Sequence, residues 1–165
     1  MNLAFDFIVD KENHSITIKR EFAAERSLVW DAYTKAELLD QWWAPKPWKA
    51  KTKIMDFREG GYWLYAMVGP RGEEHWGIAN YVKIRSHEYY SGFDAFANAE
   101  GHINPDMPQA KWEVTFIDKG SLIFIEMHTT YPDLAQLEAT IQMGFKEGIT
   151  MAMKGLDELL TSLEN

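Results

Sequence analysis

The chain has 165 residues, of which 46% are hydrophobic, and it carries a formal net charge of −8 and no cysteine. This length predicts one globular domain over residues 1–165, with a folded core of about residues 16–163. The lack of cysteine excludes disulfides, thiol catalysis and thiolate metal sites, and an acidic chain with scattered basic residues is not expected to bind nucleic acid.

Neither a membrane span nor a secretory signal is evident in the sequence. No stretch approaches the roughly 20 apolar residues that cross a bilayer. The N-terminus, Met1–Phe7, lacks the basic start and the small-residue cleavage site of a signal peptide. We therefore expect a cytoplasmic protein with no membrane partner.

The first third of the chain predicts one strand followed by two helices. Apolar and polar residues alternate over Ile16–Phe22, as in a half-buried strand. Ser27 is a candidate N-cap for the first helix, and Leu38–Trp42 continues the helical spacing. Pro45 then stops the second helix and begins a loop.

The middle of the chain predicts an antiparallel meander. Short glycine-bearing turns, Gly69–Gly72 and Asp118–Gly120, are typical of links between neighbouring antiparallel strands. The expected strands are Ala50–Phe57, Tyr62–Val68, Glu74–Ile84, Glu88–Phe96, Lys111–Ile117 and Leu122–Thr130. Residues 97–110 form a longer connection, for which a functional rim and an ordinary surface loop are equally compatible interpretations. Lys46, Lys49, Lys51 and Lys53 are interpreted as the solvated face of a strand.

The end of the chain is predicted to be helical. Asp133 is a candidate N-cap with Gln136 as its capping-box partner, and Gly144 ends or bends this first segment. A continuous apolar stripe then predicts a helix of about five turns. Its members are Phe145, Ile149, Ala152, Leu156, Leu159 and Leu163.

This order of elements resembles the helix-grip fold of the START-like (SRPBCC) superfamily, and in particular the C-terminal domain of the heat-shock chaperone ATPase activator. The residues that carry the resemblance are Phe22-Ala23-Ala24 with Val29-Trp30, Trp42-Trp43-Ala44-Pro45, Asp56 through Trp63, and Gly148 through Leu160. The resemblance implies an α+β fold in which a curved antiparallel sheet of about seven strands wraps around the long C-terminal helix. The superfamily carries many functions on this fold, so the resemblance does not identify a substrate.

The many large aromatic side chains favour a ligand cavity between the sheet and the last helix, although ordinary core packing is the alternative for each residue. Alternation divides each strand into two faces, and the sequence does not show which one points inward. The expected lining residues are Trp42, Trp48, Trp63, Tyr65, Trp76, Tyr81, Trp112, Gly148 and Ala152. The glycines of the last helix are expected to border this pocket, or else a closely packed neighbouring element.

Candidate catalytic residues are few. Glu126 and His128 share one strand face, which makes them an acid–base pair if that face is internal and solvated residues if it is external. Asp94 shares a face with Tyr90 and has the same two interpretations. The five histidines lack metal-binding spacing, so we expect no metal and no cofactor.

We therefore expect a protein that binds a small hydrophobic or amphipathic ligand. Two alternatives stay open: an interaction module for a heat-shock ATPase chaperone, with the role in stress response that the resemblance implies, and a cyclase- or hydrolase-type enzyme that uses a pocket carboxylate or histidine. The sequence shows no counterpart of the separate N-terminal domain of the eukaryotic activators, from which we expect no full co-chaperone activity.

Overall fold

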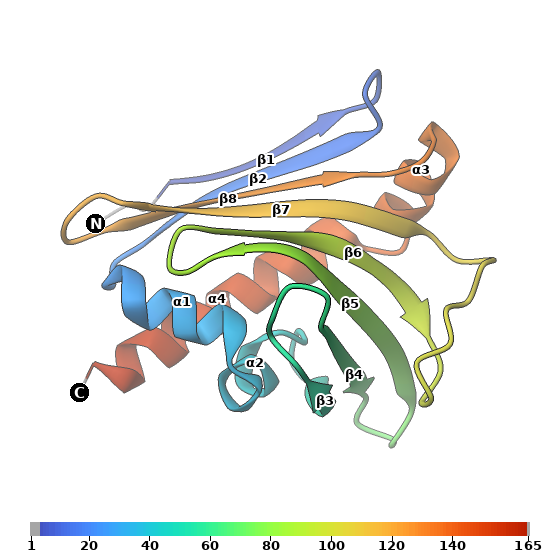
Figure 1. Ribbon diagram of the computed structural model, residues 1–165, viewed down its shortest axis with the longest axis horizontal. Helices are drawn as coiled ribbons and strands as arrows, with labels where there is room; N and C mark the ends of the chain where they lie inside the picture. Colours follow the sequence, from blue (N-terminus) through green and yellow to red (C-terminus); the bar gives the residue numbers. More distant parts are fainter. Residues whose placement is uncertain (1–3, 165) are drawn as a thin grey trace.

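A single curved antiparallel sheet arches over a long C-terminal helix in the computed structural model, which describes residues 4–164 (Figure 1). The strands are β1 (Phe5–Asp10), β2 (Ser15–Phe22), β3 (Lys49–Met55), β4 (Tyr62–Val68), β5 (Glu74–Arg85), β6 (Tyr89–Ala97), β7 (Gln109–Asp118) and β8 (Ile123–Thr130). The helices are α1 (Arg26–Thr34), α2 (Ala36–Trp42), α3 (Leu134–Gln142) and α4 (Phe145–Leu163). This is the predicted helix-grip α+β fold.

The strands lie in the order β1-β2-β8-β7-β6-β5-β4-β3, so β3 to β8 form the predicted meander and β2 closes it by pairing with β8. The sheet has eight strands where about seven were expected, because β1 was missed. β1 pairs with β2 from Phe5↔Arg20 to Asp10↔Ser15. As an edge strand it keeps Ile8 and Val9 exposed, which weakens the alternation that marks a half-buried strand.

Helix α1 begins one turn earlier than the sequence predicts. The backbone N–H of Val29 donates to the carbonyl oxygen of Glu25 over 3.2 Å, which makes Glu25 the N-cap residue and places Ser27 inside the first turn. The assignment of Ser27 as N-cap was therefore wrong. Ser27 is exposed, and no cap hydrogen bond from a side chain is formed at this end of α1.

The C-terminal helices begin where the sequence predicts. Asp133 caps α3 by accepting a hydrogen bond from the backbone N–H of Gln136 over 2.9 Å. The side chain of Gln136 does not complete a capping box; it accepts from the backbone N–H of Gln109 over 3.0 Å and ties α3 to the start of β7. Gly144, with φ at 88°, separates α3 from α4 in a left-handed conformation that glycine adopts without strain.

The core lies between α4 and the concave face of the sheet. Alternate residues of each strand point toward α4, among them Trp63 on β4, Tyr90 on β6 and Ile125 on β8. The buried residues of α4 are Ile149, Ala152, Met153, Leu156, Leu159 and Leu160. Leu163, the last member of the predicted stripe, is exposed.

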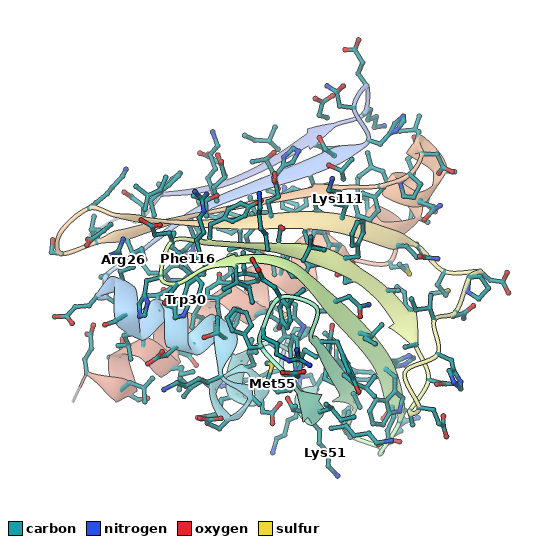
Figure 2. The ribbon with its side chains drawn as sticks, viewed as in Figure 1. Arg26, Trp30, Lys51, Met55, Lys111 and Phe116 are labelled. Carbon is teal, nitrogen blue, oxygen red and sulfur yellow. The ribbon has the colours of Figure 1, made fainter. Side chains whose placement is uncertain are left out.

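The convex face carries a second, smaller hydrophobic cluster made by Leu64, Ile78 and Ala95. The connection after β6 folds over it: a Cβ at Gly101 would lie 3.7 Å from Leu64 and 3.8 Å from Ile78. A bridge between Ala97 and Ile103 holds the connection to the sheet. The basic residues of β3 are exposed as predicted, and Lys51 extends away from the sheet in Figure 2.

Candidate functional site

The end of the concave face nearest α1 is filled by aromatic rings. Trp30 of α1 packs against Phe116 of β7 with ring centroids 4.9 Å apart, and the two side chains lie together in Figure 2. The ring of Trp30 also contacts Phe57, Tyr90 and His87. Edge-to-face packing of this kind leaves little room for a ligand at this end of the sheet.

The opposite end of the concave face is more open. Five side chains that point toward α4 by strand alternation are only half-buried there, and we call them the concave-face group: Tyr65, Met67, Asp94, Phe96 and Trp112. Met67 and Phe96 pack against neither hydrophobic cluster formed by the described residues. Apolar side chains on an inward face that meet no core residue are the lining expected of a binding site.

Two glycines allow aromatic side chains to lie flat across this end of the sheet. A Cβ at Gly77 on β5 would come within 2.9 Å of the Tyr65 ring and hydroxyl, so the Tyr65 phenol extends from β4 over Gly77 toward β6. A Cβ at Gly92 on β6 would lie 3.0 Å from the Trp112 indole, so this ring extends from β7 over β6. Both aromatic side chains therefore reach toward the same part of β6.

Asp94 lies on β6 between these two aromatic side chains. Its direct partners on the neighbouring strands are both alanine, Ala79 on β5 and Ala110 on β7. Burial raises the pKa of Asp94 from 3.8 to about 7, because the charged form is held away from water. No side chain among residues 4–164 forms a hydrogen bond or an ion pair with its carboxyl group, and part of the residue stays accessible.

The phenol of Tyr65 is fixed by stacking. Its ring lies 4.0 Å from that of Trp63 at an interplanar angle of 21°, and Trp43 meets both rings edge-on. Burial raises the pKa of Tyr65, and the nearby charge of Asp94 raises it further. The indole N–H of Trp43 is buried and has no hydrogen-bond partner within the described part of the chain.

The structure brings together only some of the residues that the sequence predicts to line a cavity. Tyr65 and Trp112 belong to the concave-face group. Trp42, Trp63, Tyr81 and Ala152 also face inward, but they are buried in the core. Trp42 in addition donates an indole hydrogen bond to the carbonyl oxygen of Ala32 over 2.8 Å, which is a structural role.

Trp76 lies apart from these residues. It packs with the smaller cluster on the convex face, under the side chain of Lys53, because β5 places Trp76 and Gly77 on opposite faces. Trp48 lies at the rim of the concave face, where its ring is 5.3 Å from that of His75. The expected grouping of Trp76 with Trp63 and Tyr65 is therefore not found.

The glycine flank of α4 faces α2 and the loop that follows it. A Cβ at Gly148 would lie 3.9 Å from Pro45, and a Cβ at Gly155 would lie 4.0 Å from Trp42. These are ordinary contact distances, so neither glycine is needed to avoid a clash. Gly144 does not belong to this flank, because it precedes the helix.

Glu126 and His128 lie on the convex face. The inward residues of β8 are Ile123, Ile125 and Met127, so the alternate positions point outward. Glu126 forms an ion pair with Lys19 over 3.8 Å, and His128 hydrogen-bonds to Thr17 over 2.9 Å. The inward titratable group is therefore Asp94 and not this pair.

Two surface hollows lie outside the concave face. One of about 380 Å³ is bordered by the outward side chains Phe93 and Lys111, with Ile103 from the connection after β6. The other, of about 470 Å³, lies at the outer edge of the sheet between Lys49 on β3 and Val68 on β4. Neither hollow includes a member of the predicted site except through the backbone around Asp94.

Sequence reasoning missed Met67, Phe96 and Trp43 as possible site residues. The signal was present in the alternation: Phe96 follows Asp94 by two residues, and Met67 follows Tyr65 by two. It could be used only after the inward face was known. Within residues 4–164, no group of three or more His, Asp or Glu side chains could hold a metal ion, and no helix is long and apolar enough to cross a membrane.

Comparison with known proteins identifies the family. Residues 23–161 match the family model described as "Activator of Hsp90 ATPase homolog 1-like protein". The chain belongs to this family. The match covers both halves of the fold, from the residues before α1 to the last turns of α4, and so includes the whole concave-face group.

Solved structures of bacterial proteins share the fold of this family member. Protein Ms6760 from Mycobacterium smegmatis is 28% identical, with a TM-score of 0.87 over 96% of this chain and 97% of its own. A protein from Arthrobacter aurescens is 25% identical, with a TM-score of 0.89 over 95% and 91% of the two chains. A protein from Staphylococcus epidermidis is 27% identical, with a TM-score of 0.82 over 93% of each. No protein of curated function matches the chain.

Proposed function

We propose that this protein binds a small apolar or amphipathic molecule at the open end of the concave face, between the concave-face group and the first turns of α4. The observation that carries the proposal is the half-buried state of Met67 and Phe96, which point inward and pack against neither hydrophobic cluster of the described residues. Water in contact with such a surface is displaced favourably by an apolar ligand.

Family membership supports the same proposal, because it places the chain on a helix-grip fold whose sheet and last helix enclose the concave face. The ligand would lie against Phe96 and Trp112, with the Tyr65 hydroxyl and the Asp94 carboxyl as its polar neighbours. Tyr65 and Trp112, which the sequence predicts as lining residues, remain in the proposed site; Trp76 does not.

The experiment uses N-phenyl-1-naphthylamine, an uncharged apolar probe whose emission rises in an apolar environment. We expect one probe per chain and quenching of tryptophan emission by energy transfer. Phe96→Ala should weaken binding by about tenfold or more, since a buried phenylalanine ring contributes about 1.5–3 kcal/mol.

Phe93→Ala is the matched control. Phe93 lies on the same strand three residues earlier, points to the convex face and is 49% exposed. It should leave probe affinity unchanged. If Phe93→Ala weakens binding and Phe96→Ala does not, the probe occupies the hollow on the convex face and the proposal fails.

A chaperone interaction is a second candidate, because the family is described by an activator of the Hsp90 ATPase. It is tested by measuring direct binding of the purified protein to a heat-shock ATPase of the same organism and the rate of ATP hydrolysis with and without the protein. An enzymatic role would depend on Asp94, since Glu126 and His128 point away from the concave face. A pKa of about 7 suits a group that exchanges a proton near neutral pH.

A further inference from the structure

The polar character of the proposed site comes from one carboxyl group. Asp94 is the inward acidic residue of β6, and no lysine or arginine among the described residues forms an ion pair with it. Arg20, which also points inward, lies on β2 and is paired with Asp157 of α4. Lys111 lies beside Asp94 on the neighbouring strand, but alternation directs it to the convex face. The negative charge of Asp94 therefore has no counterion within the described protein.

The space next to this carboxyl group is kept open by small side chains. The residues directly across from Asp94 on both neighbouring strands are alanines, Ala79 and Ala110. Cross-strand partners lie about 5 Å apart, so a larger residue at either position would cover the carboxyl group. An incoming polar group can therefore approach Asp94 from the side that faces α4.

Aromatic rings border the same space. The Tyr65 phenol lies over Gly77 and the Trp112 indole lies over Gly92, on either side of Asp94. Tyr131, at the end of β8, is close enough for the charge of Asp94 to raise its pKa, although burial raises it more. Aromatic ring faces attract cations, and rings arranged around a carboxylate are typical of sites that bind ammonium groups.

On these grounds, and resting on the proposed function, we propose that the site selects apolar molecules that carry one ammonium group, and that it disfavours apolar carboxylates. The ammonium group donates hydrogen bonds to Asp94 and lies against the rings of Tyr65 and Trp112, while the apolar chain contacts Phe96 and Met67. A carboxylate at the same position would face the charge of Asp94 with no cation nearby.

The titratable side chains that interact with Asp94 are Tyr65 on β4 and Tyr131 after β8, and burial keeps both of them neutral through the physiological range. Burial also raises the pKa of Asp94 itself to about 7. A bound cation opposes that rise, because an adjacent positive charge favours the carboxylate form. Binding of an ammonium ligand should therefore release a proton from Asp94 at neutral pH.

The test compares three molecules with the same chain: octylammonium, octanol and octanoate, measured by calorimetry at pH 8 and physiological salt. We expect octylammonium to bind at least about tenfold more tightly than octanol, and octanoate to bind most weakly. At pH 7, the binding heat of octylammonium should depend on the ionisation enthalpy of the buffer, which reports the released proton.

Asp94→Asn keeps the shape of the side chain and should bring octylammonium and octanol within about threefold of each other. The chain has a net charge of −8, which attracts any cation, so the matched control is Asp106→Asn in the exposed connection after β6. It changes the net charge by the same amount and should leave the tenfold preference intact.

The outcomes separate the two proposals. If the wild-type protein binds octanol and N-phenyl-1-naphthylamine but shows no preference for octylammonium, or if Asp106→Asn removes the preference as well as Asp94→Asn does, the ammonium proposal is wrong and the proposed function stands. If none of the apolar molecules binds at the concave face, the proposed function itself fails. The comparison of the three ligands on the wild-type protein does not depend on any variant folding.

Discussion

Asp94 makes the stability of this protein depend on pH in a direction opposite to that of most carboxyl groups. Its pKa is about 7 in the folded protein and 3.8 in the reference state. The folded state therefore binds one more proton than the unfolded chain between these two values. Stability is highest below pH 4 with respect to this group, falls as the pH rises from about 4 to about 7, and is constant above that.

The magnitude follows from the difference of about 3 pKa units. At 1.36 kcal/mol per unit, the charged carboxylate costs up to about 4 kcal/mol of folding free energy above pH 7. Part of Asp94 is accessible, so water reduces this cost and 4 kcal/mol is an upper limit. Asp94→Asn should therefore raise the free energy of unfolding by several kcal/mol at pH 8.5 and change it little at pH 4.5.

The assay is urea unfolding of the wild type, Asp94→Asn and the exposed control Asp106→Asn at pH 4.5, 6, 7 and 8.5. Only the difference between variants is interpreted, because other groups titrate in all three proteins. The stabilisation by Asp94→Asn should grow between pH 4.5 and 7 and then level off. A difference that is constant over the whole range, or an Asp94→Asn variant less stable than the wild type at pH 8.5, would refute the reasoning.

Three further predictions concern stability, and thermal or urea unfolding checks each of them. Gly92→Ala should destabilise the protein by about 2 kcal/mol or more, because the new Cβ would lie 2.2 Å from the backbone oxygen of Asn80; a wild-type melting temperature would contradict this. Gly148→Ala should stabilise it by up to about 1 kcal/mol, since the nearest atom is 3.9 Å away and glycine is a poor helix former; Gly144→Ala, at a φ of 88°, is the contrasting variant and should destabilise. Trp42→Phe should cost about 1–3 kcal/mol, because the carbonyl oxygen of Ala32 loses its 2.8 Å hydrogen bond in the core, and an unchanged stability would show that this bond contributes nothing.

Local patterns were sufficient to predict most of the fold. The α4 helix runs over Phe145–Leu163 as predicted, because one apolar stripe and the preceding Gly144 mark its start and its buried side. β4 also has its predicted bounds, Tyr62–Val68, since turn residues flank it on both sides. β1 was missed because an edge strand with exposed Ile8 and Val9 lacks a clear alternation of buried and exposed positions.

The candidate site was less predictable for a different physical reason. Alternation divides a strand into two faces but does not say which of them meets the helix, and both faces of β4 and β5 carry large apolar residues. The convex face has its own cluster because the connection after β6 covers it, so Trp76 is as well suited to its position as Trp63 is. Asp94 could be assigned to the interior only once its neighbours Tyr90 and Gly92 were placed.

The residues without large side chains around Asp94 also bear on how this fold could change its ligand. Gly77, Ala79, Gly92 and Ala110 set the room above the carboxyl group, and none of them contributes more than a methyl group to the interior. Replacing Ala79 or Ala110 by valine or leucine would reshape the binding space while leaving the strand pairing and the helices unaltered. Ligand preference and fold can thus diverge independently, since each depends on a different set of positions in the same four strands.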